Sequence, residues 1–314
     1  MDLRQLATFL QVAELGSLSR AAERLRIAQP ALSRQIRLLE AELGTPLFLR
    51  HGRGMQLTAA GDRLRGRAGA ILRQVEETRA DLAEAAGAVR GKVVFGLPPT
   101  VGAVLTARLV ERFLAAHPEA TLRVVQGFSG YLLDWLQGGE LDLAVVYAGG
   151  QGAGVRQTPL LTEGLCFVGP PGPGLAPHQA IGFAEAMRER LVLPGPAHGL
   201  RRLVEAEAAQ RGLALRIAVE ADDLSVLKAL AMRRLGGTVL PLAAVREEVA
   251  AGLLGAAPII DPPLTRKLAV AEPLGRHPSN AATAFARLLR AEVAGMVEAG
   301  IWSGQLLRGD RNPA

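Results

Sequence analysis

The sequence predicts an α/β protein in three consecutive parts, on the strength of three features. Residues 1–58 read as short helices joined by a tight turn and followed by a small hairpin. Residues 59–90 read as one long amphipathic helix. Over residues 91–300 strands and helices alternate, which is typical of mainly parallel sheets covered by helices. A chain of 314 residues is long enough for two or three such domains.

The second helix of the N-terminal pair is amphipathic. Its apolar positions recur at helical spacing and are expected on one face: Leu32, Ile36, Leu39 and Leu43. Ser19 is expected to cap the preceding helix. Pro30 suits the first turn of the second helix, where no backbone N–H is needed. A helix placed in this way can lie in the major groove of DNA. The candidate DNA-binding residues on it are Gln29, Pro30, Ser33, Arg34 and Arg37.

A basic hairpin, or wing, follows this helix. Two short apolar segments flank the turn His51-Gly52-Arg53-Gly54. Arg50 and Arg53 are placed to reach the sugar-phosphate backbone or a minor groove. An amphipathic helix with two arginines is, taken alone, usually a solvated surface helix. The ordered set of helix, turn, Pro-led helix and basic hairpin is much rarer and favours DNA binding.

This region resembles the winged helix-turn-helix of LysR-type transcriptional regulators, closely over residues 1–90. The resemblance rests on the runs Ala21-Ala22-Glu23-Arg24-Leu25, Gln29-Pro30-Ala31-Leu32-Ser33-Arg34-Gln35-Ile36, Pro46-Leu47-Phe48 and Leu57-Thr58-Ala59-Ala60-Gly61. It implies DNA contacts by Gln29, Ser33, Arg34 and Arg37, with Arg53 in the wing. It also implies a homotetramer, built as a dimer of dimers, on an inverted repeat in promoter DNA, with RNA polymerase as a further partner. Ala28 stands where the family commonly has a capping Ser or Thr.

Charge and composition agree with a nucleic-acid partner. Residues 1–92 hold 15 Lys and Arg against 10 Asp and Glu, a net charge of +5. The remainder holds 21 against 20, a net charge of +1. A basic N-terminal part on a near-neutral body favours attraction to phosphates that weakens as salt rises. The single cysteine, Cys166, and the lack of a long apolar run or a signal pattern predict a soluble, cytoplasmic protein away from membranes.

The long helix of residues 59–90 carries an apolar stripe that needs a partner. Its members are Leu64, Ala68, Ile71, Leu72, Val75, Leu82, Ala85 and Ala86. An antiparallel copy from a second subunit is the expected partner, as in the family that this chain resembles. The alternative is a helix packed on its own effector domain.

The body is expected to form two α/β lobes. Strands are expected at 92–97, 121–126, 141–147, 165–169, 191–193, 215–220, 238–240 and 266–271, and helices at 100–116, 131–137, 200–211, 223–234 and 280–299. Lobe I takes about 91–161 and 266–300, and lobe II about 162–265. This order resembles the periplasmic-binding-protein fold of the LysR-type effector domain. Residues 301–314 are expected to be a tail without an assigned role, with disorder as one interpretation.

A ligand in such a fold lies at the carboxyl ends of the strands, where helices begin. The candidate effector-binding residues are Pro99, Thr100, Gly127, Phe128, Ser129, Tyr147, His198 and Arg201. Thr100 and Ser129 each have an alternative role as helix caps. His198 and Arg201 form a cationic pair that would suit a carboxylate, the alternative being a surface loop with an exposed arginine. Pro99 removes a hydroxyl that many members of the family carry there.

No pattern in the body indicates an enzyme, a cofactor or a metal. There is no nucleophile elbow, phosphate loop or dinucleotide fingerprint, and the five histidines show no ligand spacing. A transporter's solute-binding protein would have no use for residues 1–90. The sequence therefore predicts a transcriptional regulator that responds to a small, anionic metabolite. The alternative is a constitutive DNA-binding regulator without an effector.

Overall fold

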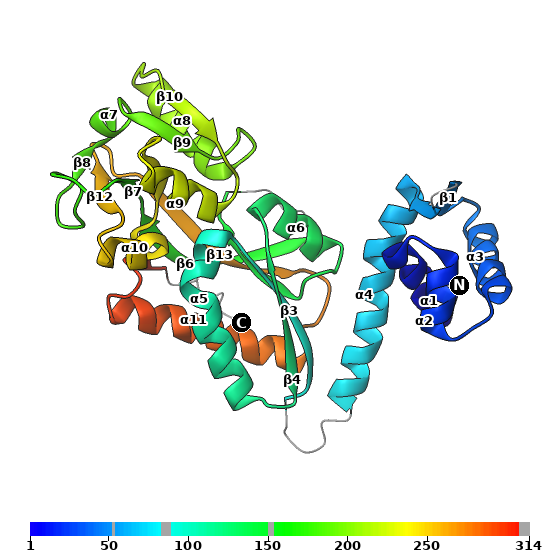
Figure 1. The fold of residues 1–314 in the computed structure, drawn as a ribbon. Coiled ribbons are helices and arrows are strands. Elements are labelled where there is room, and N and C mark those ends of the chain that lie inside the picture. The colour runs from blue at the N-terminus through cyan, green and yellow to red at the C-terminus, as the bar shows by residue number, and fades with distance from the viewer. Residues whose placement is uncertain (52–53, 83–88, 150–153, 308–314) are drawn as a thin grey trace.

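The computed structural model describes residues 1–51, 54–82, 89–149 and 154–307, and it has the three expected parts (Figure 1). The N-terminal unit contains α1 (Leu3–Leu15), α2 (Leu18–Leu25) and α3 (Gln29–Leu43). The antiparallel hairpin of β1 (Phe48–His51) and β2 (Gly54–Leu57) completes it. The long helix α4 (Ala59–Leu82) leads away from this unit towards the α/β body.

One small hydrophobic core holds the N-terminal unit together. Leu32, Ile36 and Leu39 of α3 are fully buried in it, as their spacing predicts. Two local predictions are wrong. Ser17, rather than Ser19, caps α2, because its side chain accepts a hydrogen bond from the backbone N–H of Arg20. Leu43 is exposed, since α3 ends there and Gly44 turns the chain away.

Helix α4 packs on two parts of its own chain. Thr58 caps it by accepting a hydrogen bond from the backbone N–H of Gly61 at 3.0 Å. Ala68 is buried in the N-terminal core, and Leu64 and Leu72 pack against the same core. Another face of α4 lies against the effector body, so the alternative expectation holds for that face. Within the expected stripe, Ile71 is exposed, whereas residues 85 and 86 lie outside the described residues.

Lobe I is a six-stranded sheet covered on both faces. The strands are β3 (Gly91–Leu97), β4 (Ala120–Gln126), β5 (Leu143–Tyr147), β6 (Val155–Gly164), β13 (Thr265–Pro273) and β14 (Gly304–Leu306), in the order β14-β6-β13-β5-β3-β4. Helices α5 (Pro99–Ala116) and α11 (Asn280–Glu298) cover one face, where Val93 and Phe95 point. Helix α6 (Ser129–Gln137) covers the other face, where Val94 points.

Lobe II contains the remaining elements. Its strands are β7 (Cys166–Gly169), β8 (Ile181–Gly182), β9 (Arg190–Leu193), β10 (Arg216–Glu220), β11 (Thr238–Leu240) and β12 (Gly255–Ile260). Its helices are α7 (Phe183–Ala186), α8 (Gly199–Gln210), α9 (Leu224–Met232), the 3-10 turn η1 (Leu242–Val245) and α10 (Arg246–Ala250). Antiparallel β6 and β13 pair along their lengths and carry the chain between the lobes.

The C-terminal segment is part of the fold, so the expected tail is wrong for residues 301–307. Strand β14 pairs with β6 and extends the sheet of lobe I. Trp302 is 1% exposed and lies in the main core of that lobe. Its indole Nε1–H donates a hydrogen bond to Glu163 Oε2 at 2.9 Å. Residues 308–314 lie outside the described residues.

Trp302→Ala should lower the free energy of unfolding of the effector body by about 3–5 kcal/mol, because it empties a large buried site. The measurement is urea denaturation of the purified protein, followed by circular dichroism. Trp302→Phe is the matched control. It keeps most of the ring volume and loses the N–H donor, so a loss of only about 1–2 kcal/mol is expected. A Trp302→Ala protein as stable as the wild type would contradict this packing.

Candidate DNA-binding surface and effector pocket

The outer face of α3 is a polar surface available to a partner. Gln29, Pro30, Arg34 and Arg37 are exposed and Ser33 is partly exposed, while the apolar face is buried. Ala28 precedes the helix and provides no side-chain cap, as its identity predicts. Arg50 lies in β1, and Arg53 lies outside the described residues.

Two polar contacts hold α3 at a fixed angle. Thr8 Oγ1 of α1 donates to Gln35 Oε1 at 3.0 Å. Glu40 Oε1 accepts from the backbone N–H groups of Leu47 and Phe48, at 2.8 and 3.2 Å, where the wing begins. This role of Glu40 was not predicted from the sequence. The available signal was an acidic residue one turn before the end of α3, next to a segment whose backbone donors needed partners.

A pocket lies between the two lobes. It is lined by Pro98, Pro99, Thr100, Phe128, Tyr147, Pro194, His198, Leu200, Asp222, Leu224, Leu227, Leu240 and Arg266. The space is about 370 Å³, part of it open to solvent. Helices α5, α6, α8 and α9 begin around it, so that their N-terminal dipoles favour a negative group. Across the pocket the rings of Phe128 and His198 meet edge to face, with centroids 4.6 Å apart.

Five of the eight residues expected at the pocket line it: Pro99, Thr100, Phe128, Tyr147 and His198. Three others have supporting roles. The hydroxyl of Ser129 accepts a hydrogen bond from the backbone N–H of Tyr147 at 2.9 Å. Gly127 lies under the Trp135 ring, where a Cβ atom would come within 2.9 Å of it.

Arg201 is the third, and the cationic pair expected of it and His198 does not form. Its buried guanidinium donates to Glu205 at 2.7 Å, to Glu220 at 3.0 Å and to the carbonyl oxygen of Pro194 at 3.0 Å. It is therefore neither in the pocket nor exposed on a surface loop. Its side chain supports the loop at Pro194 from the side that faces away from the pocket.

His198 is a neutral hydrogen-bonding group. Its Nδ1 accepts from the backbone N–H of Leu200 at 3.0 Å and so caps α8. Burial, assisted by the positive charge of Arg266, lowers the pKa of His198 to about 4. At pH 7 the ring is uncharged and carries its hydrogen on Nε2, which leaves one N–H donor for a ligand.

The cation at the pocket is Arg266 of β13, which was not predicted from the sequence. It is 7% exposed, and its Nη2 donates to Glu163 Oε1 at 2.8 Å. The guanidinium carbon lies 3.8 Å from the centre of the Tyr147 ring. Among the described residues its Nε has no hydrogen-bond partner. The sequence signal was the alternation of β13, which places Arg266 on the same buried face as Leu268.

The remaining polar groups of the pocket are two hydroxyls and one carboxylate. The hydroxyls of Thr100 and Tyr147 lie 2.6 Å apart. Burial raises the pKa of Tyr147 well above its usual range, so the phenol stays protonated. Asp222 is exposed at the rim, where its Oδ1 accepts from the backbone N–H of Gly195 at 2.9 Å. The positive charge of Arg266 is balanced by Glu163, and Asp222 adds a negative charge at the rim.

The described residues hold no cluster that could bind a metal and no membrane-spanning helix, and their one cysteine is buried. No group of three His, Cys, Asp or Glu side chains there could hold a metal ion. Cys166 is buried, and its burial raises the pKa of the thiol to about 11, so it stays protonated at neutral pH. Within the same residues no helix has both the length and the apolar character needed to cross a bilayer.

The fold and the two sites define a DNA-binding regulator with a separate ligand-binding body. The family model described as Bacterial regulatory helix-turn-helix protein, lysR family, matches residues 3–62, and that of the LysR substrate binding domain matches residues 86–294. The chain therefore belongs to the LysR family of DNA-binding transcriptional regulators with an effector-binding domain. This confirms the family and the fold that the sequence predicts, and the function as a DNA-binding transcriptional regulator with an effector-binding domain.

Several regulators and structures resemble most of the chain. It is 35% identical over 247 residues to the nitrogen assimilation regulatory protein nac of Klebsiella aerogenes, covering 78% of this chain and 80% of that protein. It is 34% identical over 254 residues to the transcriptional regulator BbuR of Bordetella bronchiseptica, covering 81% and 78%. A full-length OxyR variant from Pseudomonas aeruginosa has a TM-score of 0.71 at 26% identity, covering 93% and 94%. CbnR complexed with its target DNA has the same fold, with a TM-score of 0.69 at 23% identity and coverage of 93% and 100%.

The lowered pKa of His198 predicts a loss of stability in acid. The unfolded chain binds a proton near pH 6.5, whereas the folded protein binds it only near pH 4, so stability is complete above the first value and falls between the two. By pH 5 the loss should be roughly 1 kcal/mol, after allowing for solvent screening of this partly exposed ring. His198→Asn keeps a capping side chain and cannot titrate. Urea denaturation at pH 7 and pH 5 should show a smaller loss for the variant, and equal losses would contradict the assignment.

Proposed function

We propose that this protein is a sequence-specific, ligand-responsive regulator that acts on promoter DNA in the cytoplasm. The observation that carries the proposal is the exposed polar face of α3, held at a fixed angle by Gln35 and Glu40. Two such helices in a dimer would read the two halves of an inverted repeat. Pairing of dimers into a homotetramer and contact with RNA polymerase belong to the same proposal.

The DNA-binding residues divide into two groups. Gln29, Ser33, Arg34 and Arg37 face the major groove, where an arginine can donate two hydrogen bonds to one guanine. Pro30 starts the helix at the groove. Arg50 and Arg53 of the wing contact phosphates, which adds affinity without sequence preference.

Arg34→Ala should weaken binding to the preferred duplex by about 1–3 kcal/mol and relax specificity at one base pair. Arg53→Ala should weaken all duplexes alike and reduce the salt slope by about one phosphate contact. Fluorescence anisotropy with a preferred and a scrambled duplex, at several salt concentrations, separates the two effects. If both variants behaved identically on both duplexes, the division of roles would be wrong.

We propose that the effector is a small amino carboxylate with an apolar side chain. Its carboxylate would meet the guanidinium of Arg266, the Nε2–H of His198 and the N-terminal ends of α5 and α6. A plain anion suits the charge balance poorly, because Glu163 already neutralises Arg266 and Asp222 lies at the rim. An ammonium group beside Asp222 corrects that balance. The apolar body would lie among Phe128, Leu224 and Leu227, which line the same space.

Thermal-shift titration with matched pairs of compounds tests the effector class. In each pair, such as valine and isovalerate or phenylalanine and 3-phenylpropionate, the amino acid should stabilise the protein more than the deaminated acid. Asp222→Asn should remove this advantage. Glu189→Gln, an exposed acid of lobe II outside the pocket, should keep it. Equal shifts within every pair, or no shift with any compound, would sink the proposal.

The alternative, a constitutive regulator, has one observation in its favour. The lobes touch through Phe128 and His198, a contact made by the protein's own side chains. A DNA footprint that is indifferent to every compound that binds the pocket would favour this alternative.

A further inference from the structure

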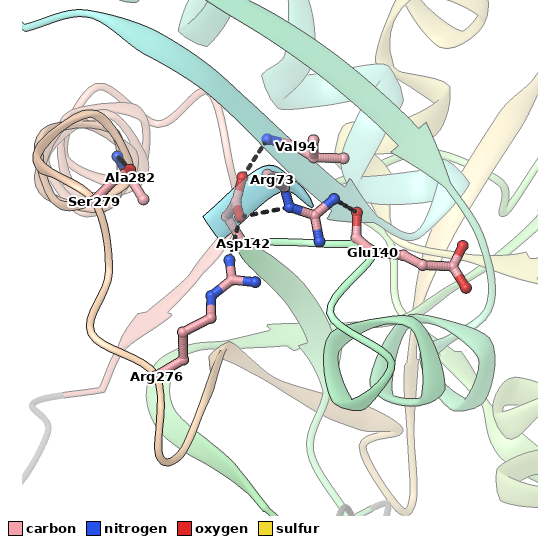
Figure 2. A network of polar contacts seen from close by, with 7 residues as sticks. All are labelled: Arg73, Val94, Glu140, Asp142, Arg276, Ser279 and Ala282. Carbon is pink, nitrogen blue, oxygen red and sulfur yellow. Dashed lines mark hydrogen bonds and ion pairs between the residues drawn. The ribbon is translucent and has the colours of Figure 1, made fainter. Parts of the chain in front are cut away.

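A buried carboxylate joins helix α4 to lobe I. Asp142 precedes β5, and its side chain is 2% exposed. Its Oδ2 accepts from the backbone N–H of Val94 at 2.7 Å, and its Oδ1 accepts from Arg276 Nη2 (Figure 2). Arg73 of α4 brings its Nε to 3.7 Å from the same Oδ1. Arg73 Nη1 also donates to the carbonyl oxygen of Glu140 at 3.1 Å.

Close backbone contact surrounds this ion pair. Gly66, Ala70 and Arg73 are spaced by four and three residues, which places them on one face of α4. That face lies on the turn that follows α6. A Cβ atom added to Gly139 would come within 2.4 Å of Ala70 Cβ, and one added to Gly66 would lie 3.9 Å from the carbonyl oxygen of Gly138. The close approach at Gly139 therefore needs a residue without a side chain opposite Ala70, whereas a Cβ atom at Gly66 would make only ordinary van der Waals contact.

The opposite face of α4 belongs to the N-terminal core, through Ala68, Leu64 and Leu72. A helix with one face in each unit transmits any change in its placement to α3. Without Arg73 the carboxylate would still be paired with Arg276 and the Val94 N–H, so what Arg73 adds is the tie between α4 and lobe I: its ion pair with Asp142 and its hydrogen bond to the carbonyl oxygen of Glu140.

Two neighbouring strands connect this attachment to the effector pocket. Strand β5 starts directly after Asp142 and ends at Tyr147, which lines the pocket. Strand β13 contains Arg266 at its pocket end, and Arg276 follows its other end. The two strands are antiparallel partners, and the five residues of β5 span roughly 17 Å. One end of this strand pair therefore carries the pocket residues Tyr147 and Arg266. The other end lies next to Asp142 and Arg276 of the attachment to α4.

We propose that Asp142, acting through Arg73, is the positioning residue that fixes the DNA-binding unit on lobe I and so sets the spacing at which paired recognition helices meet DNA. The inference rests on the proposed function only for its DNA readout. The attachment itself is a property of one chain. Arg73 rather than Asp142 is the residue to change, because Asp142 also supports the fold of the body through Val94.

The variant is Arg73→Ala. The matched control is Arg65→Ala, which removes an exposed arginine of the same helix together with its ion pair to Asp62. Duplexes selected by the wild type from a random pool are rebuilt with the half-sites moved apart or together by one and two base pairs. The wild type and Arg65→Ala should discriminate sharply between spacings. For Arg73→Ala, the ratio of affinities between the selected spacing and the shifted spacings should fall at least about fivefold. That factor is the lower end of the usual coupling between two sites. Arg73→Lys should restore part of it.

A single half-site duplex separates this inference from the proposed function. Arg73→Ala should bind it as the wild type does. Failure of the wild type to select any duplex would end the DNA-binding proposal itself. Wild-type spacing discrimination in Arg73→Ala, or equal loss in Arg65→Ala, overturns the positioning role.

A second readout does not involve DNA. Spin labels at Glu23→Cys and Glu111→Cys, both exposed positions, report the distance between the N-terminal unit and lobe I in a Cys166→Ala background diluted with unlabelled protein. The distance distribution should be narrow with Arg73 and broad with Arg73→Ala. An unchanged distribution overturns the inference even if the variant is less stable.

Discussion

A charge buried between two lobes must be neutralised there, and the Arg266–Glu163 pair is the constraint on which the effector body depends. The two residues are direct cross-strand neighbours on β13 and β6, the strands that link the lobes. Removing either partner would leave an uncompensated buried charge, at a cost of several kcal/mol. Trp302 donates to the second oxygen of Glu163, and Tyr147 lies against the guanidinium. The C-terminal segment, the crossing strands and the end of β5 are therefore held in one arrangement, and the cation at the pocket is in place before any ligand arrives.

Local patterns predicted most of the fold, because helices and buried strands are encoded by spacing over a few residues. The buried face of α3 and the strands from β3 to β5 follow their sequence patterns closely. The pocket was predicted only in part. Arg201 was expected to face a ligand, but it forms ion pairs with two glutamates of lobe II. Arg266, which does line the pocket, was predicted only as part of a strand. The partner of Arg201, Glu205, is only four residues away and could be read from helical spacing, whereas Glu163 lies 103 residues from Arg266, a separation that no local pattern covers. Trp302 shows the same limit, since its partner is 139 residues away.

Different faces of helix α4 pack on different parts of the chain. The sequence favoured a single partner, an antiparallel copy of the helix. In the structure Leu64, Ala68 and Leu72 pack on the N-terminal core, while Gly66, Ala70 and Arg73 pack on lobe I. Among the described positions, Arg67, Ile71, Gln74 and Thr78 share an exposed face between these two. A second copy of the chain could pack on this exposed face of α4 without disturbing either contact. Dimer formation and attachment to lobe I are therefore compatible on one helix.

The comparison structures share the fold of this chain, yet the chemistry of its pocket must be read from its own residues. Here the single cysteine lies in β7 within the core of lobe II, and burial raises the pKa of its thiol to about 11. A thiol that is neither exposed nor ionised reacts slowly with oxidants, because the thiolate is the reactive form. On the proposed function, a signal would therefore reach this protein as a molecule bound between the lobes rather than as a modified cysteine. The polar side chains that line the pocket are Arg266, the neutral His198, the hydroxyl-bearing Thr100 and Tyr147, and Asp222 at the rim.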